Sequence, residues 1–73
     1  MISLDLHGVL HANVQGIVRM FLKKHRVNRP LEIITGNSNR MRDLTVEVLR
    51  EFSLDYEPKS YHNLGSLIIW KMK

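Results

Sequence analysis

Two short stretches of this sequence contain residue types that could transfer protons or bind a phosphate. The first is Asp5-Leu6-His7-Gly8 and the second is Thr35-Gly36-Asn37-Ser38-Asn39. A carboxylate two residues from an imidazole can orient the ring and support its charged form, so Asp5 and His7 are candidates for general acid–base catalysis. The same spacing also fits a structural role, in which Asp5 closes a turn and His7 is an ordinary surface residue.

The second stretch has the composition of a loop that binds an anion at the start of a helix. Gly36 lets the backbone turn, and the amides of residues 37–40 would face outward at the positive end of the helix that follows. Arg40 and Arg42 add guanidinium groups, which suit phosphate. An ordinary connection between a strand and a helix, with two solvated arginines, is the alternative.

A metal site is a third candidate. Asp5, His7 and His11 could supply three ligands of mixed oxygen and nitrogen type. Three such residues near one turn are also common where no metal binds, so the favoured interpretation has no metal ligands and requires no cofactor, with Mg²⁺ kept as an option. The chain contains no cysteine, which excludes a disulfide framework, a zinc ribbon, an iron–sulfur site and a thiol nucleophile.

Hydrophobic periodicity predicts the elements that must position these stretches. Alternating or β-branched runs predict strands over residues 2–7, 31–35, 54–57 and 66–72, with Pro58 ending the third. Apolar residues at helical spacing predict amphipathic helices over residues 10–24 and 40–52, and Ser38 or Asn39 could cap the second. Turns are expected around Gly8, at residues 36–39 and at residues 63–65.

The resulting order, β-α-β-α-β-β, predicts an α/β fold. Strands separated by helices imply right-handed parallel crossovers, and the final pair adds a hairpin-like or mixed edge. Two helices cannot cover both faces of a sheet, so we expect a two-layer domain over residues 1–73 with both helices on one face of a small mixed sheet. Ligands of such sheets bind outside the carboxyl ends of the parallel strands, where residues 5–8 and 35–39 would meet.

Length and charge limit the partners. The 73 residues suffice for one domain with one small core, and 11 Lys and Arg against 7 Asp and Glu give a net charge of +4. This charge weakly favours a polyanionic partner such as nucleic acid. A secreted protein this small would usually carry disulfide bridges, and this one has no cysteine, so we expect a cytoplasmic protein. It has no apolar run of membrane-spanning length and no signal peptide, so we expect no membrane binding. We expect a monomer or a weak homodimer formed through a C-terminal edge strand.

A few further residues could contact a partner. Tyr61, near a turn, is a candidate for stacking on bases, whereas Trp70 is expected in the core. A small protein–protein adaptor is a third functional class, and it would need an exposed apolar patch to which Leu31, Leu64 and Ile68 could contribute.

Taken together, these segments resemble the Smr family, the small MutS-related domain. The family opens with L-D-x-H-G, which is present here as Leu4-Asp5-Leu6-His7-Gly8. A helix ending in an F-L pair follows, matched by Phe21-Leu22, and then a strand enters a T-G-x-G loop, matched by Thr35-Gly36-Asn37-Ser38. The resemblance spans nearly the whole chain, and L-D-x-H-G is its most specific motif.

The resemblance implies a domain that binds RNA or DNA, since several members of the family are endonucleases that cut RNA or nick DNA. It implies a role in cleavage for Asp5 and His7, and it implies that the second loop contacts the substrate. A module that binds nucleic acid or the ribosome without catalysis is the alternative. With the two arginines, the candidate nucleic-acid-binding residues are Thr35, Gly36, Asn37, Ser38, Arg40 and Arg42.

Two features depart from the family's pattern. Ser38 stands where the family has the second loop glycine, and a left-handed backbone would strain a serine there. We therefore expect a different loop shape, in which Asn37 or Asn39 takes the left-handed conformation. His62 and Asn63 replace the glycine pair that usually forms the last turn.

Overall fold

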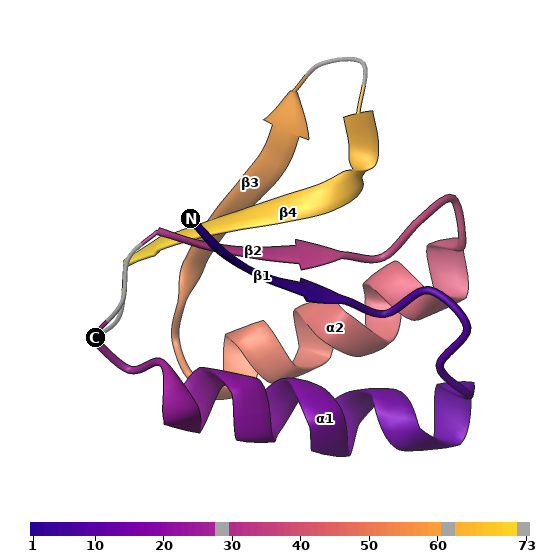
Figure 1. The fold of residues 1–73 in the computed structure, drawn as a ribbon, viewed down its shortest axis with the longest axis horizontal. Helices are drawn as coiled ribbons and strands as arrows, with labels where there is room; N and C mark the ends of the chain where they lie inside the picture. Colours follow the sequence, from indigo (N-terminus) through magenta and orange to yellow (C-terminus); the bar gives the residue numbers. More distant parts are fainter. Residues whose placement is uncertain (28–29, 61–62, 72–73) are drawn as a thin grey trace.

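A computed structural model describes residues 1–27, 30–60 and 63–71 of the chain, with backbone alone at residues 63, 64 and 71 (Figure 1). Its element order is the predicted β-α-β-α-β-β. The elements are β1 (Ile2–Asp5), α1 (His11–Lys24), β2 (Leu31–Ile34), α2 (Asn39–Glu51), β3 (Asp55–Ser60) and β4 (Asn63–Lys71).

The four strands form one mixed sheet in the order β1-β2-β4-β3. β1 and β2 are parallel, as expected, whereas β4 is antiparallel to both β2 and β3. The last strand therefore lies inside the sheet, and the edge strand of the C-terminal pair is β3. Leu67, Ile68 and Ile69 are all buried, and an apolar run that is buried on both faces is typical of an interior strand.

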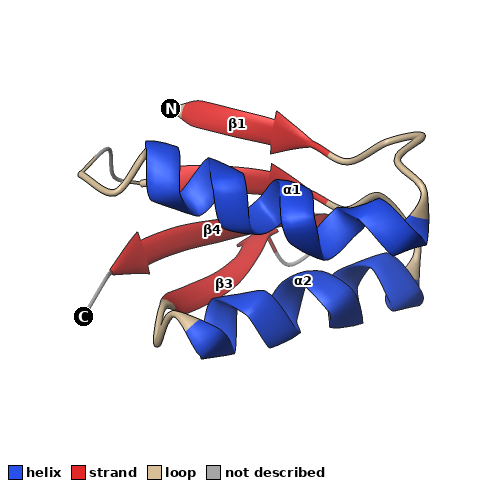
Figure 2. Ribbon diagram, turned by 90° about the horizontal axis from the view of Figure 1, so that it is seen from below, coloured by secondary structure: helices blue, strands red, loops and turns tan. Residues whose placement is uncertain are grey.

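Both helices cover the same face of the sheet, which confirms the two-layer arrangement (Figure 2). They lie side by side and run in the same direction, since Gln15 of α1 bonds Glu47 of α2 and Arg19, one turn later, bonds Glu51. Neither helix in the described part of the chain is long and apolar enough to cross a membrane. The core between the layers consists of Leu6, Val14, Val18, Phe21, Leu22, Leu31, Ile33, Met41, Leu44, Val48, Leu49, Leu54, Leu67 and Ile69.

The C-terminal hairpin differs from the sequence prediction. Pro58 does not end β3, which continues to Ser60. An edge strand tolerates proline because one side of its backbone makes no ladder hydrogen bonds, and β3 is such an edge. Asn63 and Gly65, expected in a turn, lie in β4. Tyr61 and His62 lie outside the described residues.

The prediction that Trp70 lies in the core is also wrong. Trp70 is 52% exposed, because it alternates with Leu67 and Ile69 and so faces away from the helices. Leu31 and Ile68, which could have contributed to an exposed apolar patch, both have buried side chains. The side chain of Leu64 is not among those described.

Candidate functional site

The two candidate stretches meet at one edge of the sheet. β1 and β2 are parallel and in register, with Asp5 beside Ile34. The ladder continues one residue further, where the Leu6 amide donates to the Ile34 carbonyl at 2.9 Å. The turn after β1 and the loop after β2 therefore start side by side (Figure 1). We call residues 5–11 and 35–40 together the loop edge.

The first stretch is a tight turn closed by its own carboxylate. Asp5 Oδ1 accepts from the backbone amide of His7 at 2.8 Å. The Val9 amide donates to the Leu6 carbonyl at 3.0 Å, and Gly8 takes a φ of 79°, as the third residue of a type II turn requires. This contact matches the structural alternative for Asp5. Among the described residues, no hydrogen bond or ion pair joins the Asp5 carboxylate to the exposed His7 imidazole.

The second stretch is attached to β4 through one carbonyl group. The amides of Thr35 and Gly36 donate to the Gly65 carbonyl at 2.7 and 3.0 Å. The Thr35 hydroxyl donates to the same oxygen at 3.2 Å, and Thr35 is only 3% exposed. Thr35 therefore holds the loop in place from inside, while Gly36, with a φ of 67°, turns the chain out of the sheet.

Gly65 is a site residue that sequence reasoning missed. A Cβ atom at this position would lie 2.8 Å from the Gly36 carbonyl oxygen and 3.0 Å from its carbonyl carbon. The two backbones approach closely only because Gly65 has no side chain. A lone glycine beside an apolar strand run is a signal of such an approach, whereas the local sequence pattern predicts a turn at Gly65.

Ser38 caps α2. Its φ is −85°, and its hydroxyl accepts from the Met41 amide at 3.1 Å. The expectation of a left-handed Asn37 or Asn39 is wrong, since the positive φ values of the described residues belong to Gly8, Gly36 and Ser53. Gly36 already makes the turn, so the serine can take the extended conformation of a cap without strain.

The loop edge has an excess of hydrogen-bond donors. In the described structure, the backbone amides of residues 37–40 donate no hydrogen bond. Both α1 and α2 begin at this edge, and neither has an acidic residue in its first turn. The positive ends of two helix dipoles therefore point to the same place, and the exposed Arg40 adds a full positive charge there.

Comparison of the chain with protein-family models, with curated proteins and with solved structures finds no match. His7, Asn37 and Arg40 are exposed at the loop edge, whereas Thr35 is buried and Arg42 is half-buried. A ligand at this edge would meet the first three side chains directly.

The metal option receives no support from the geometry. Within residues 1–27, 30–60 and 63–71, no group of three or more His, Asp or Glu side chains is arranged to hold a metal ion. Asp5, His7 and His11 share the loop edge but do not form such a group.

His25 lies at the far end of α1, where its ring contacts Phe21 with the centroids 5.0 Å apart.

Proposed function

We propose that this protein binds nucleic acid at the loop edge and cleaves a phosphodiester bond there, with His7 as the group that transfers the proton. The observation that carries the proposal is the parallel register of β1 and β2, which sets the His7 turn next to the donor-rich loop that precedes α2. Cleavage needs proton transfer and phosphate binding, and the stretches that carry the candidate residues for each lie side by side.

The phosphate-binding part of the proposal rests on three features. The amides of residues 37–40 point at no acceptor within the described chain, and α2 begins behind them. Arg40 is exposed and can bond two phosphate oxygens at once. The net charge of +4 attracts a polyanion to the molecule as a whole.

The chemical part assigns separate roles to His7 and Asp5. RNA is the favoured substrate because its 2′-hydroxyl can attack the neighbouring phosphate, so the protein has only to move protons and stabilise charge. His7 would accept the proton of the 2′-hydroxyl or donate one to the leaving oxygen. Asp5, bonded to the His7 amide, would position the turn that carries the imidazole. The resemblance to the Smr family implies the same two residues.

Binding without catalysis is the second candidate function, and one observation favours it. The Asp5 carboxylate is bonded to backbone and makes no contact with the imidazole among the described groups, so the ring lacks the partner that usually orients a catalytic histidine. In this case the loop edge would hold RNA, DNA or a ribosomal RNA surface and leave it intact.

A cleavage assay separates the two functions. Wild-type protein, His7→Ala and the control His25→Ala would be incubated with labelled structured RNA, single-stranded RNA and supercoiled plasmid, in EDTA and in Mg²⁺. We expect His7→Ala to lose RNA cleavage, while His25→Ala, at the opposite end of α1, retains it. A 2′-deoxy substitution at the cut site should also block the reaction. Full cleavage by His7→Ala would rule out the catalytic role.

A binding assay tests the site itself. Arg40 and Arg50 lie at opposite ends of α2, and both are exposed, so their alanine variants change the net charge equally. We expect Arg40→Ala to weaken RNA binding and to lower the slope of log K against log salt by about 1, because one phosphate contact is lost. Equal effects of the two variants would mean that the binding site is not the loop edge.

A further inference from the structure

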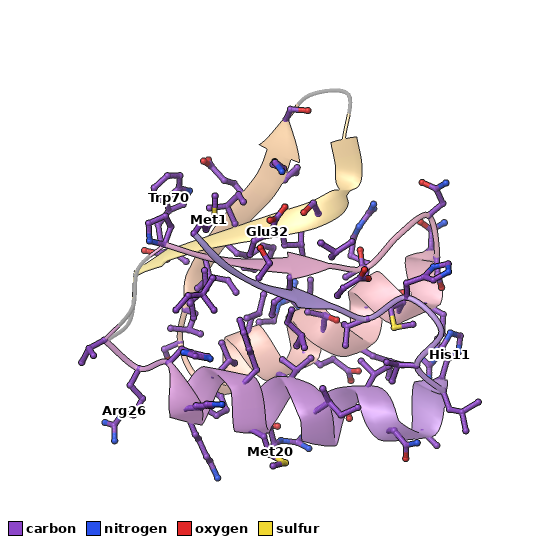
Figure 3. All side chains as sticks on the ribbon, in the orientation of Figure 1. Met1, His11, Met20, Arg26, Glu32 and Trp70 are labelled. Atoms are coloured by element: carbon purple, nitrogen blue, oxygen red, sulfur yellow. The ribbon has the colours of Figure 1, made fainter. Side chains whose placement is uncertain are left out.

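The sheet has a second face that neither helix covers. α1 and α2 both lie on one side, and the strand residues that alternate away from them form what we call the uncovered face (Figure 2). Figure 3 shows Glu32 and Trp70 on this side of the sheet. The face is formed by Ser3, Glu32, Glu57, Ser66, Ile68 and Trp70.

The centre of the uncovered face is a carboxylate that is already satisfied. Glu32 is 7% exposed and accepts hydrogen bonds from the hydroxyls of Ser66 and Ser3. Lys59 Nζ completes the group at 3.1 Å. The bonds from Ser66 and then Ser3, with a smaller contribution from Lys59, hold the pKa of Glu32 below its usual range. This group gives the face a fixed polar centre, in which the ammonium of Lys59 is already paired with Glu32.

Trp70 and Glu57 form an exposed pair beside this centre. The indole N–H of Trp70 donates to Glu57 Oε1 at 2.8 Å, from β4 to the neighbouring β3. The bond holds the half-exposed ring next to a carboxylate. A guanidinium is the group that such a pair fits, because it stacks on an indole face and binds a carboxylate through directed hydrogen bonds.

The charge of the face argues against a phosphate and for a cation. Among the described side chains, Glu32 and Glu57 lie on it, Asp5 lies at its end, and Lys59 is bonded to Glu32. Six of the 11 Lys and Arg residues lie on the helices: Arg19, Lys23, Lys24, Arg40, Arg42 and Arg50. A polyanion is drawn to the helix layer and the loop edge, and a cationic segment to the uncovered face.

We propose that the uncovered face is a docking surface for an arginine-containing segment of a partner protein, with the guanidinium stacked on Trp70 and paired with Glu57. Ile2, Leu31 and Ile69 are paired in one row across the sheet, so their chain neighbours Met1 and Trp70 lie at the same end of it. The exposed Met1 side chain adds apolar surface for the partner. The loop edge and this pair share no residue, so the proposal stands whether or not the protein binds nucleic acid.

The experiment uses the fluorescence of Trp70, which is the single tryptophan of the chain. The probe is a capped peptide that alternates glycine with arginine, and its control carries neutral citrulline in place of arginine. We expect a saturable change in emission with the arginine peptide and none with the citrulline peptide. Glu57→Gln should weaken the arginine peptide at least about fivefold, because the charged hydrogen bonds to the guanidinium are lost.

Glu47→Gln is the matched control, since Glu47 is an exposed carboxylate on α2, in the other layer. It should leave the affinity unchanged, and both variants should unfold thermally like the wild type. If both variants weakened binding of the arginine peptide equally, the effect would come from the net charge of the protein and the proposal would be overturned. An equal response to the citrulline peptide, or no response to either, would also overturn it. A larger response to oligouridine, strengthened by Glu57→Gln, would assign the face to nucleic acid instead.

Discussion

Replacing Gly65 with alanine should displace the loop that follows β2. The added Cβ would lie 2.8, 3.0 and 3.3 Å from the carbonyl oxygen, carbonyl carbon and Cα of Gly36. All three are backbone atoms, so no side-chain rotation relieves the contact. The two segments must separate by roughly half an ångström to reach ordinary van der Waals distance.

The size of the effect follows from what that separation disturbs. The Gly65 carbonyl accepts from the Thr35 amide, the Gly36 amide and the Thr35 hydroxyl. Each of these hydrogen bonds contributes about 0.5–1.5 kcal/mol. Overpacking a well-packed site typically costs about 1–3 kcal/mol. We therefore expect Gly65→Ala to lower the free energy of unfolding by about 1–3 kcal/mol. For a domain of this size, each kcal/mol lowers Tm by about 4–8 °C.

Gly16→Ala is the matched control. Gly16 lies within α1, and a Cβ there would meet nothing within 4 Å. The same substitution should therefore stabilise the protein by about 0.5–1 kcal/mol, through the lower backbone entropy of alanine in the unfolded chain.

Urea and thermal unfolding followed by circular dichroism would measure both variants. RNA binding would be measured in parallel, and it should weaken for Gly65→Ala because the donor-rich loop has moved. If Gly65→Ala were as stable as the wild type, the close approach of the two backbones would be refuted. If Gly16→Ala lost as much stability, the effect would belong to alanine itself and not to the contact with Gly36.

Two further predictions concern carboxylates. The pKa of Glu32 is lowered in the folded state, chiefly by the hydrogen bond from Ser66. The ionised carboxylate therefore stabilises the fold fully above the ordinary glutamate pKa of about 4.3. This stabilisation is lost as the pH falls through the lower pKa of the folded state. Urea midpoints between pH 3 and 6 should therefore fall more steeply with acid for wild type than for Glu32→Gln, and parallel curves would contradict this. Asp5→Asn keeps an acceptor for the His7 amide and Asp5→Ala does not, so the alanine variant should lose more stability and more RNA binding. If asparagine is as damaging as alanine in both measurements, the charge of Asp5 matters beyond the turn.

The elements of this fold could be predicted from local patterns. The alternation of Leu4 and Leu6 with polar neighbours predicted β1, and the spacing of Leu44 and Val48 predicted α2. The capping serine could be recognised by its residue type, since a hydroxyl before a helical stripe satisfies an amide of the first turn. These features depend on residues a few positions apart, so the chain specifies them before any tertiary contact forms.

The meeting of the two loops could also be predicted, because a strand–helix–strand unit almost always crosses over with one hand and places its strands parallel. The hydrogen-bond partners of the loop residues could not be predicted. Asp5 is bonded to the His7 backbone, and Thr35 is turned inward to Gly65. A sequence motif names the residues present, whereas the direction of each polar group depends on which backbone donors and acceptors lie within reach.

The amino-acid sequence by itself determined the α/β class, the element order, two candidates for the cap of α2 and the meeting of the two loops at one edge of the sheet. Only the tertiary structure decided that β4 lies between β2 and β3, and three consequences follow from that pairing. Gly65 contacts Gly36, Glu32 is bonded to Ser66 across the sheet, and Trp70 is exposed on the uncovered face. Each depends on residues about thirty or more positions apart or on the face toward which a strand is turned, and local periodicity carries no information about either.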